Sequence, residues 1–224
     1  ASTATVRFSG ANDADITGTM ALETGGILVS STVGAHTSTI SASLTSGAGN
    51  ELIINQYNIF GDLVLSNVDG TANTILTTTG GGRTLLTNNM TGTGTTNIGY
   101  GYLQLGDSTA GGSAAGMVGS GAILNNGTLG FNRSNSQTIA AVISGLGNLE
   151  QLGSGTTIIT GTNTFQGRVT VRSGILEIQN NAGLGASAAA VTNRWANLTS
   201  VNTGGTLRIN VTSGGTLSEL LSLD

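Results

Sequence analysis

The sequence predicts an all-β solenoid of short stacked strands with little or no helix. Three observations lead to this fold class. Glycine accounts for 37 of the 224 residues and interrupts short runs of β-branched and aliphatic residues along the whole chain. No segment keeps a 3.6-residue apolar period long enough for a helix, whereas short runs bounded by glycine turns are typical of strands. The same short pattern also recurs along the chain, which is the mark of a repeat protein.

The composition favours order over disorder. Glycine, threonine, serine and asparagine together make up just over half of the chain, yet only 8% of residues are charged and proline is absent. Disordered chains are usually rich in charge and proline and poor in aliphatic residues. Low charge, frequent β-branching and frequent glycine instead suit short strands joined by tight corners.

The clearest copy of the pattern lies in residues 145–178. Weaker copies occupy residues 98–135 and 203–220, and residues 1–97 are predicted to form degenerate coils of the same single domain, 1–224. In the clearest copy, the apolar residues that fall at strand positions are Leu149, Ile158, Val169, Val171, Leu176 and Ile178.

A Gly-x-Leu element marks the successive copies. Its intervals are irregular but mostly one to two times ~20 residues, a period typical of solenoids. A strand of this length cannot bury its apolar face alone, so it must stack on its counterpart in the next coil, about 4.8 Å away. At this period the chain is predicted to form about ten coils. The element starts at residues 26, 61, 101, 127, 147, 174, 205 and 215.

The motif in residues 145–178 resembles a known family. The spacing G-x-G-x-L-x-x-x-G-x-G-T-x-x-x-x-G-x-N-T-F-x-G-x-x-T-V-x-x-G-x-L is similar to the autotransporter-associated β-strand repeat of bacterial type V secretion passengers. Residues 101–135 resemble the segment that often precedes this repeat, and residues 203–209 resemble part of the next one. The resemblance implies a right-handed parallel β-helix, secreted or displayed at the cell surface, that serves as a stalk, adhesin or matrix component.

The carboxylates give little sign of an active site, although polysaccharide lyases and hydrolases also use β-helices. Asp13 and Asp15 form the only close acidic pair, and a solvated loop, a Ca²⁺ site and catalysis are the alternatives. Glu150 and Glu177 are predicted to stack about one coil apart as a surface charge ladder, which Arg168 and Arg172 could neutralise. The prediction is therefore no catalytic, cofactor-binding or metal site.

Other candidate groups also have structural interpretations. His36 is the only histidine and is predicted to be an exposed loop residue with no local partner. Residues 80–84 (GGGRT) contain a glycine run, but they lack the Lys-Ser/Thr ending of a phosphate-binding loop and are predicted to form a corner. A sugar-stacking face is conceivable if the aromatic residues line up, although core or edge packing is the simpler expectation; these residues are Tyr57, Tyr100, Tyr102 and Trp195.

Charge and cysteine content exclude several classes of function. The chain has no cysteine, and therefore no disulfide, thiol nucleophile or thiolate metal site. A net charge of −4 without any basic block argues against nucleic acid as a partner. No apolar run approaches the ~18 residues of a membrane span, so this segment is not expected to insert into a membrane.

The lack of edge-blocking residues suggests self-association. Solenoid ends expose unpaired strands, and this chain has neither proline nor lysine to protect them. We expect either further repeats or end-to-end stacking of copies. The first functional hypothesis is a non-enzymatic extracellular rod that forms a stalk or filament. The alternatives are an adhesin that binds glycans or cells through one face, and a β-helix polysaccharide lyase or hydrolase.

Overall fold

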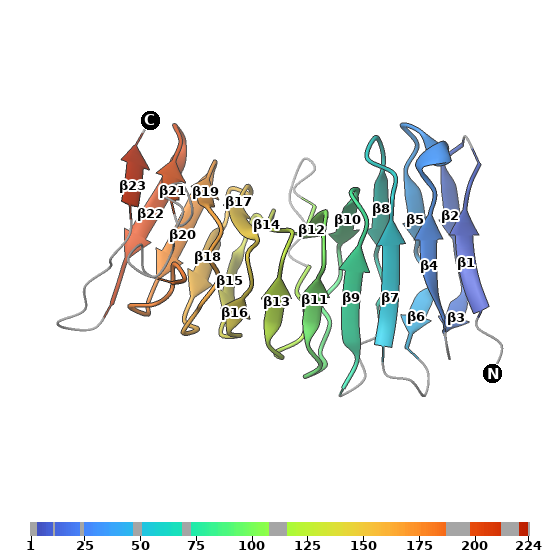
Figure 1. Ribbon diagram of the computed structural model, residues 1–224, viewed down its shortest axis with the longest axis horizontal. Coiled ribbons are helices and arrows are strands. Elements are labelled where there is room, and N and C mark those ends of the chain that lie inside the picture. Colours follow the sequence, from blue (N-terminus) through green and yellow to red (C-terminus); the bar gives the residue numbers. More distant parts are fainter. Residues whose placement is uncertain are drawn as a thin grey trace.

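The computed structural model shows a solenoid whose strands stack side by side along its long axis (Figure 1). The structure describes residues 4–10, 12–22, 25–46, 51–68, 73–107, 116–186, 198–211 and 220–223. In these segments the only helix is one 3₁₀ turn, η1 (Ser31–Val33), and the paired strands are parallel. The predicted all-β solenoid with almost no helix is confirmed.

The first side of the solenoid is a seven-stranded sheet. Its outer residues alternate with inner ones that are buried in the core. The strands, in stacking order, are β1 (Ala4–Phe8), β4 (Gly25–Val29), β7 (Glu51–Gln56), β9 (Ile75–Thr79), β11 (Thr96–Ile98), β13 (Ile123–Asn125) and β16 (Ile143–Ser144).

The second side is a ten-stranded sheet, which runs along the solenoid from β2 near one end to β23 at the other (Figure 1). We call it the long sheet. Its strands, in stacking order, are β2 (Ala14–Ile16), β5 (Ser38–Ile40), β8 (Asp62–Leu65), β10 (Arg83–Leu86), β12 (Tyr102–Leu105), β14 (Thr128–Phe131), β17 (Asn148–Gln151), β19 (Val169–Val171), β21 (Leu198–Val201) and β23 (Leu220–Leu223).

The third side is less regular. A two-stranded sheet lies toward the N-terminal end and a four-stranded sheet toward the C-terminal end, and single bridges such as Leu44↔Val68 and Asn89↔Met117 occur between them. The strands are β3 (Thr19–Ala21) with β6 (Ser43–Thr45), and β15 (Ser136–Ile139), β18 (Thr156–Ile159), β20 (Gly174–Ile178) and β22 (Gly205–Ile209).

Coil length varies along the chain. Leu129 pairs with Leu149 after 20 residues, whereas Val169 pairs with Thr199 after 30. The period of ~20 therefore holds for compact coils only, and longer coils carry insertions. For this reason the chain forms about 8 turns, slightly fewer than the ten coils predicted from the shortest period.

The core consists of apolar ladders that run along the solenoid. In the long sheet, the in-register pairs place one inward residue of each coil directly over the next. Full burial of one such aliphatic side chain contributes roughly 1.5–3 kcal/mol. One ladder consists of the buried residues Leu63, Thr84, Leu103, Leu129, Leu149, Val169 and Thr199.

The Gly-x-Leu element is explained by the corner that enters the long sheet. A Cβ atom on Gly147 would lie 2.3 Å from the carbonyl oxygen of Gly127, and one on Gly127 would lie 2.6 Å from that of Gly101. Successive coils approach too closely here for any side chain, and the leucine two residues later enters the core. The copies at Gly174 and Gly205 begin third-side strands instead. The copy at Gly26 lies in β4 of the seven-stranded sheet. The irregular intervals in the sequence thus arise partly because one pattern serves all three sides.

Candidate ligand-binding face

Charged and aromatic side chains gather on the outer surface of the long sheet. Asp62, Arg83 and Tyr102 are the first residues of β8, β10 and β12, and the parallel register places them side by side. Because residues that alternate along a strand point to opposite faces, these three lie outside the core while the next residue of each strand faces inward. The stacking of coils therefore assembles an outer site from residues about 20 positions apart.

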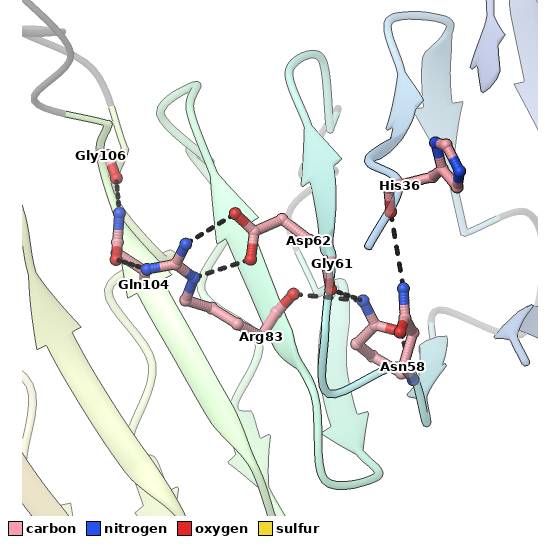
Figure 2. Close-up of polar contacts among 8 residues, drawn as sticks. His36, Asn58, Gly61, Asp62, Arg83, Gln104 and Gly106 are labelled. Carbon is pink, nitrogen blue, oxygen red and sulfur yellow. Dashed lines mark hydrogen bonds and ion pairs between the residues drawn. The ribbon is translucent and has the colours of Figure 1, made fainter. Parts of the chain in front are cut away.

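Arg83 is held by its neighbours on both sides. Its Nε donates to Oδ1 of Asp62 at 2.8 Å and its Nη2 to Oδ2 at 2.7 Å, while Nη1 donates to Oε1 of Gln104 at 3.4 Å. Figure 2 shows the guanidinium lying between the Asp62 carboxylate and the Gln104 amide. The hydrogen bonds to Asp62 raise the pKa of Arg83, partly opposed by burial. This two-point geometry fixes the planar cation in one orientation.

Tyr102 reaches across a neighbouring strand to Glu150. Its hydroxyl donates to Oε2 of Glu150 at 3.0 Å, although β14 lies between β12 and β17. The ring passes over Gly130, where a Cβ atom would lie 2.3 Å from the tyrosine oxygen. The other Glu150 oxygen accepts from Nη2 of Arg172 at 3.1 Å. Burial, and secondarily the charge of Glu150, raise the pKa of Tyr102, so its hydroxyl stays a neutral donor.

Three adjoining grooves cover this face. The largest, about 590 Å³, is bordered by Phe60, the two ion pairs and Tyr102. A second of about 370 Å³ runs over the corner glycines between Tyr100 and Leu146. The grooves share lining residues: Tyr102 belongs to the first and second, and Glu150 and Arg172 belong to the first and to a third of about 370 Å³. We call this continuous surface the long-sheet groove.

An exposed apolar ridge borders the groove. It lies at the corners that lead into the long sheet, and its side chains are mostly solvent-exposed: 71% for Phe60, 67% for Tyr100 and 69% for Leu146. Ile59 and Tyr100 flank Gly81, because a Cβ atom there would lie 3.3 Å from Cγ2 of Ile59 and 3.7 Å from Cε1 of Tyr100. We call Ile59, Phe60, Tyr100 and Leu146 the corner ridge.

The aromatic residues named from the sequence are only partly brought together. Tyr100 and Tyr102 line the groove, whereas Tyr57 is exposed at the same corner as Phe60 but does not line it. Trp195 lies outside the described residues. Phe60, Asp62 and Arg83 also line the groove, and no local motif marks them as site residues. The 21-residue spacing from Asp62 to Arg83, one coil length, was the signal that could have paired them.

The acidic pair near the N-terminus is engaged across coils. Oδ1 of Asp13 accepts from the backbone N–H of Thr37 at 2.8 Å and lies 3.3 Å from Nδ1 of His36. Oδ1 of Asp15 accepts from the backbone and hydroxyl of Ser41. His36 therefore has a partner that its local sequence did not reveal. Among the described residues, no group of three or more His, Cys, Asp or Glu side chains could hold a metal ion.

The predicted stacking of Glu150 and Glu177 is wrong. Glu150 lies on β17 of the long sheet and Glu177 on β20 of the third side, because the 27 residues between them exceed one compact coil. Arg172 pairs with Glu150 as suggested, but Glu177 pairs with Arg208 at 2.9 Å. Hydrogen bonds from Asn210, Gln179 and Arg208 lower the pKa of Glu177 from 4.5 to about 2.

The glycines of the run at residues 80–84 form a corner, as predicted, whereas Arg83 and Thr84 begin β10. This corner joins β9 to β10, and Gly80 has a φ of 93°, a conformation that side-chain-bearing residues rarely adopt.

In the part of the chain that the structure describes, no helix has the length and apolar character needed to cross a bilayer.

Comparison with known proteins bears directly on the coils that form this face. Residues 149–178 match the family model described as the passenger-associated transport repeat. The chain carries an autotransporter passenger repeat. This passenger repeat begins on β17 and ends with β20, so it supplies Glu150 and Arg172 of the groove together with the coil that supports them.

One relative extends the comparison. The chain is 39% identical over 80 residues to the adhesin BmaC autotransporter of Brucella suis biovar 1 (strain 1330). The match covers 36% of this chain and 2% of that much longer protein. No solved structure gives a significant match.

Proposed function

We propose that this chain is part of an exported, non-enzymatic rod that holds a ligand-binding face at the bacterial surface. The observation that carries the proposal is that the passenger repeat forms part of a continuous stack of coils whose long sheet bears a groove bordered by exposed aromatic residues. The similarity to a protein named as an autotransporter adhesin supports the same role. A solenoid suits it because each added coil lengthens the rod without changing its cross-section.

The pairing of the groove carboxylates favours binding over hydrolysis. Glycoside hydrolysis needs one carboxyl group that carries a proton and a second that acts as base or nucleophile. Asp62 and Glu150 border the same groove, but each is ion-paired with an arginine. Both carboxylates already accept hydrogen bonds from these arginines, so each is engaged within the protein.

End-to-end association into a stalk or filament remains a further proposal. Parallel coils stack through backbone hydrogen bonds and apolar ladders, and a second copy in register would extend both. This arrangement is compatible with a binding face, because the grooves lie on the side of the rod and not at its ends.

Binding to cells tests the main proposal. Fluorescent beads coated with the purified 224-residue chain should bind cultured host cells or matrix-coated surfaces saturably, and beads coated with the heat-unfolded chain should not. Equal binding by both preparations, or by neither, would contradict an adhesin role. Release of reducing ends from a panel of polysaccharides, at a rate above that of the heat-unfolded control, would contradict the non-enzymatic assignment.

A further inference from the structure

We propose that the long-sheet groove binds an extended, uncharged glycan. This inference rests on the proposed function, because it names the ligand class of the same face. The groove combines apolar rings at its rim with planar polar groups on its floor, and both kinds of group face solvent rather than the core.

The charge balance of the largest groove favours an uncharged ligand. The largest groove contains two carboxylates, Asp62 and Glu150, and two guanidinium groups, Arg83 and Arg172, so its charges cancel. Each charge is also paired locally, with N–O distances of 2.7 and 3.1 Å. In the largest groove an anionic polymer would find no net positive field, and a cationic peptide no net negative one. The third groove adds one more guanidinium, Arg168, so the long-sheet groove as a whole carries one excess positive charge beside β19. A hydroxyl-rich neutral ligand meets donors and acceptors without having to displace a counter-charge.

The floor of the groove is built to donate and accept hydrogen bonds in fixed directions. Arg83 and Arg172 are about half exposed, at 47% and 51% of their side-chain surface, so N–H groups remain accessible beside each ion pair. The Tyr102 hydroxyl is oriented by Glu150 across Gly130. The two parallel donors of Arg83 are used on Asp62. A sugar hydroxyl would meet the remaining N–H groups of the arginines and the remaining lone pairs of the carboxylates.

The corner ridge provides the apolar part of the recognition. Phe60 and Tyr100 expose about two thirds or more of their surface next to the polar floor. Aromatic rings bury a large apolar area at small entropic cost, and a tyrosine keeps a polar end in water. A sugar ring has a C–H face that packs on such rings while its hydroxyl groups reach the floor.

The continuity of the grooves indicates a ligand of several sugar units. The three grooves share Tyr102, Asn148, Glu150 and Arg172 among their borders, so they form one surface along successive strands of the long sheet. Those strands repeat at about 4.8 Å, and the shallow floor of corner glycines leaves the backbone within reach of a ligand. A linear oligosaccharide fits this geometry better than a single sugar.

Binding to defined glycans tests the inference. The intact chain would be applied to an array of neutral gluco-, galacto-, manno- and N-acetylglucosamine oligosaccharides, together with sialylated glycans and heparin, and hits would be measured by calorimetry. Neutral oligosaccharides should bind, with affinity little changed between low and high salt because no ion pair forms with the ligand. Phe60→Ala and Tyr100→Ala should each lower affinity about tenfold, as expected for aromatic anchors.

Leu124→Ala provides the matched control. Leu124 is 44% exposed but lies on β13 of the seven-stranded sheet, away from the groove, and its truncation should leave binding unchanged. A second variant, Asp62→Asn/Glu150→Gln, removes two negative charges and leaves both arginines unpaired. It should lose neutral glycans and gain salt-sensitive heparin binding. Circular dichroism and melting curves would confirm that each variant is folded.

Several outcomes would overturn the glycan assignment. These are failure to bind any neutral glycan, binding of anionic glycans only, affinity unaffected by the two aromatic variants, or a dimer in sedimentation experiments that the aromatic variants dissociate. If the beads still bind cells in any of these cases, the adhesin role survives and only the ligand class is wrong. If neutral glycans bind but the beads fail on all cells, the glycan site stands and the adhesin role fails.

Discussion

Substitution of a single corner glycine should test whether the close approach of coils determines the sequence pattern. Gly147 precedes β17 and its φ lies outside the positive range that favours glycine. Alanine is therefore acceptable to the local backbone. Its Cβ atom, however, would lie 2.3 Å from the carbonyl oxygen of Gly127 and 2.5 Å from Oδ1 of Asn125. The first of these is backbone, and it cannot move without shifting the neighbouring coil.

The magnitude follows from two opposing effects. Overpacking of a tight site costs about 1–3 kcal/mol. Replacing glycine with alanine also lowers the conformational entropy of the unfolded chain. Where the native backbone conformation accepts alanine, this stabilises the folded state by about 0.4–1 kcal/mol and offsets part of the steric cost. Because the steric contact is far inside van der Waals distance, the cost should dominate. For a domain of this size, Gly147→Ala should lower the melting temperature by about 2–8 °C.

Gly99→Ala is the matched comparison. A Cβ atom at Gly99 would meet nothing closer than 3.6 Å, the carbonyl oxygen of Thr78, which is an ordinary contact. This variant should melt at or slightly above the temperature of the wild type. Thermal unfolding followed by circular dichroism compares the three proteins. Equal stability of Gly147→Ala and the wild type, or equal destabilisation by both substitutions, would refute the steric explanation of the corner glycines.

Three further predictions concern the core, one ion pair and assembly. Leu129→Ala should cost about 2–5 kcal/mol in denaturant unfolding, because Leu129 is fully buried in the long-sheet ladder, whereas Leu124→Ala should cost under about 0.5 kcal/mol. The pKa of Glu177 is depressed in the folded protein. Its ionised carboxylate therefore contributes to the free energy of unfolding above about pH 4.5, and this contribution is lost as the pH falls toward 2. Glu177→Gln should therefore melt below the wild type at pH 7, and the gap should close as the pH falls through that window; a constant gap would contradict the assignment. Finally, end-to-end stacking predicts rods of increasing length by electron microscopy as concentration rises, and a monodisperse monomer would exclude it.

The architecture was predictable because it depends on short-range features. A glycine at a corner with a leucine two residues later, as in Gly147 and Leu149, appears as a contiguous motif, and the roles of the two residues follow from corner sterics and core burial. The number of turns was predicted less accurately than the fold class, because that number depends on the length of every coil. The step of 30 residues from Val169 to Thr199 shows how insertions conceal the period.

The placement of side chains on a given side was harder to predict. Glu150 and Glu177 each follow a Gly-x-Leu element, and this shared context suggested equivalent positions. The structure assigns the two elements to different sides of the same solenoid. Local sequence does not reveal which side a strand belongs to, because all three sides contain strands with the same alternation of buried and more exposed residues, such as β8, β9 and β18.

The groove was hidden from sequence analysis because its contacts are separated by whole coils. Tyr102 and Glu150 are 48 residues apart and meet only because the coil steps of 26 and 20 residues place Tyr102 level with Thr128 and Asn148. Their hydrogen bond also depends on Gly130, whose role is to leave space rather than to make contact. In a solenoid, a functional site therefore becomes visible once the register of the coils is known. Residues one or two coil lengths apart, at the same place in their strands, are then the pairs to inspect, and Asp62 with Arg83 is the pair that such a search finds first.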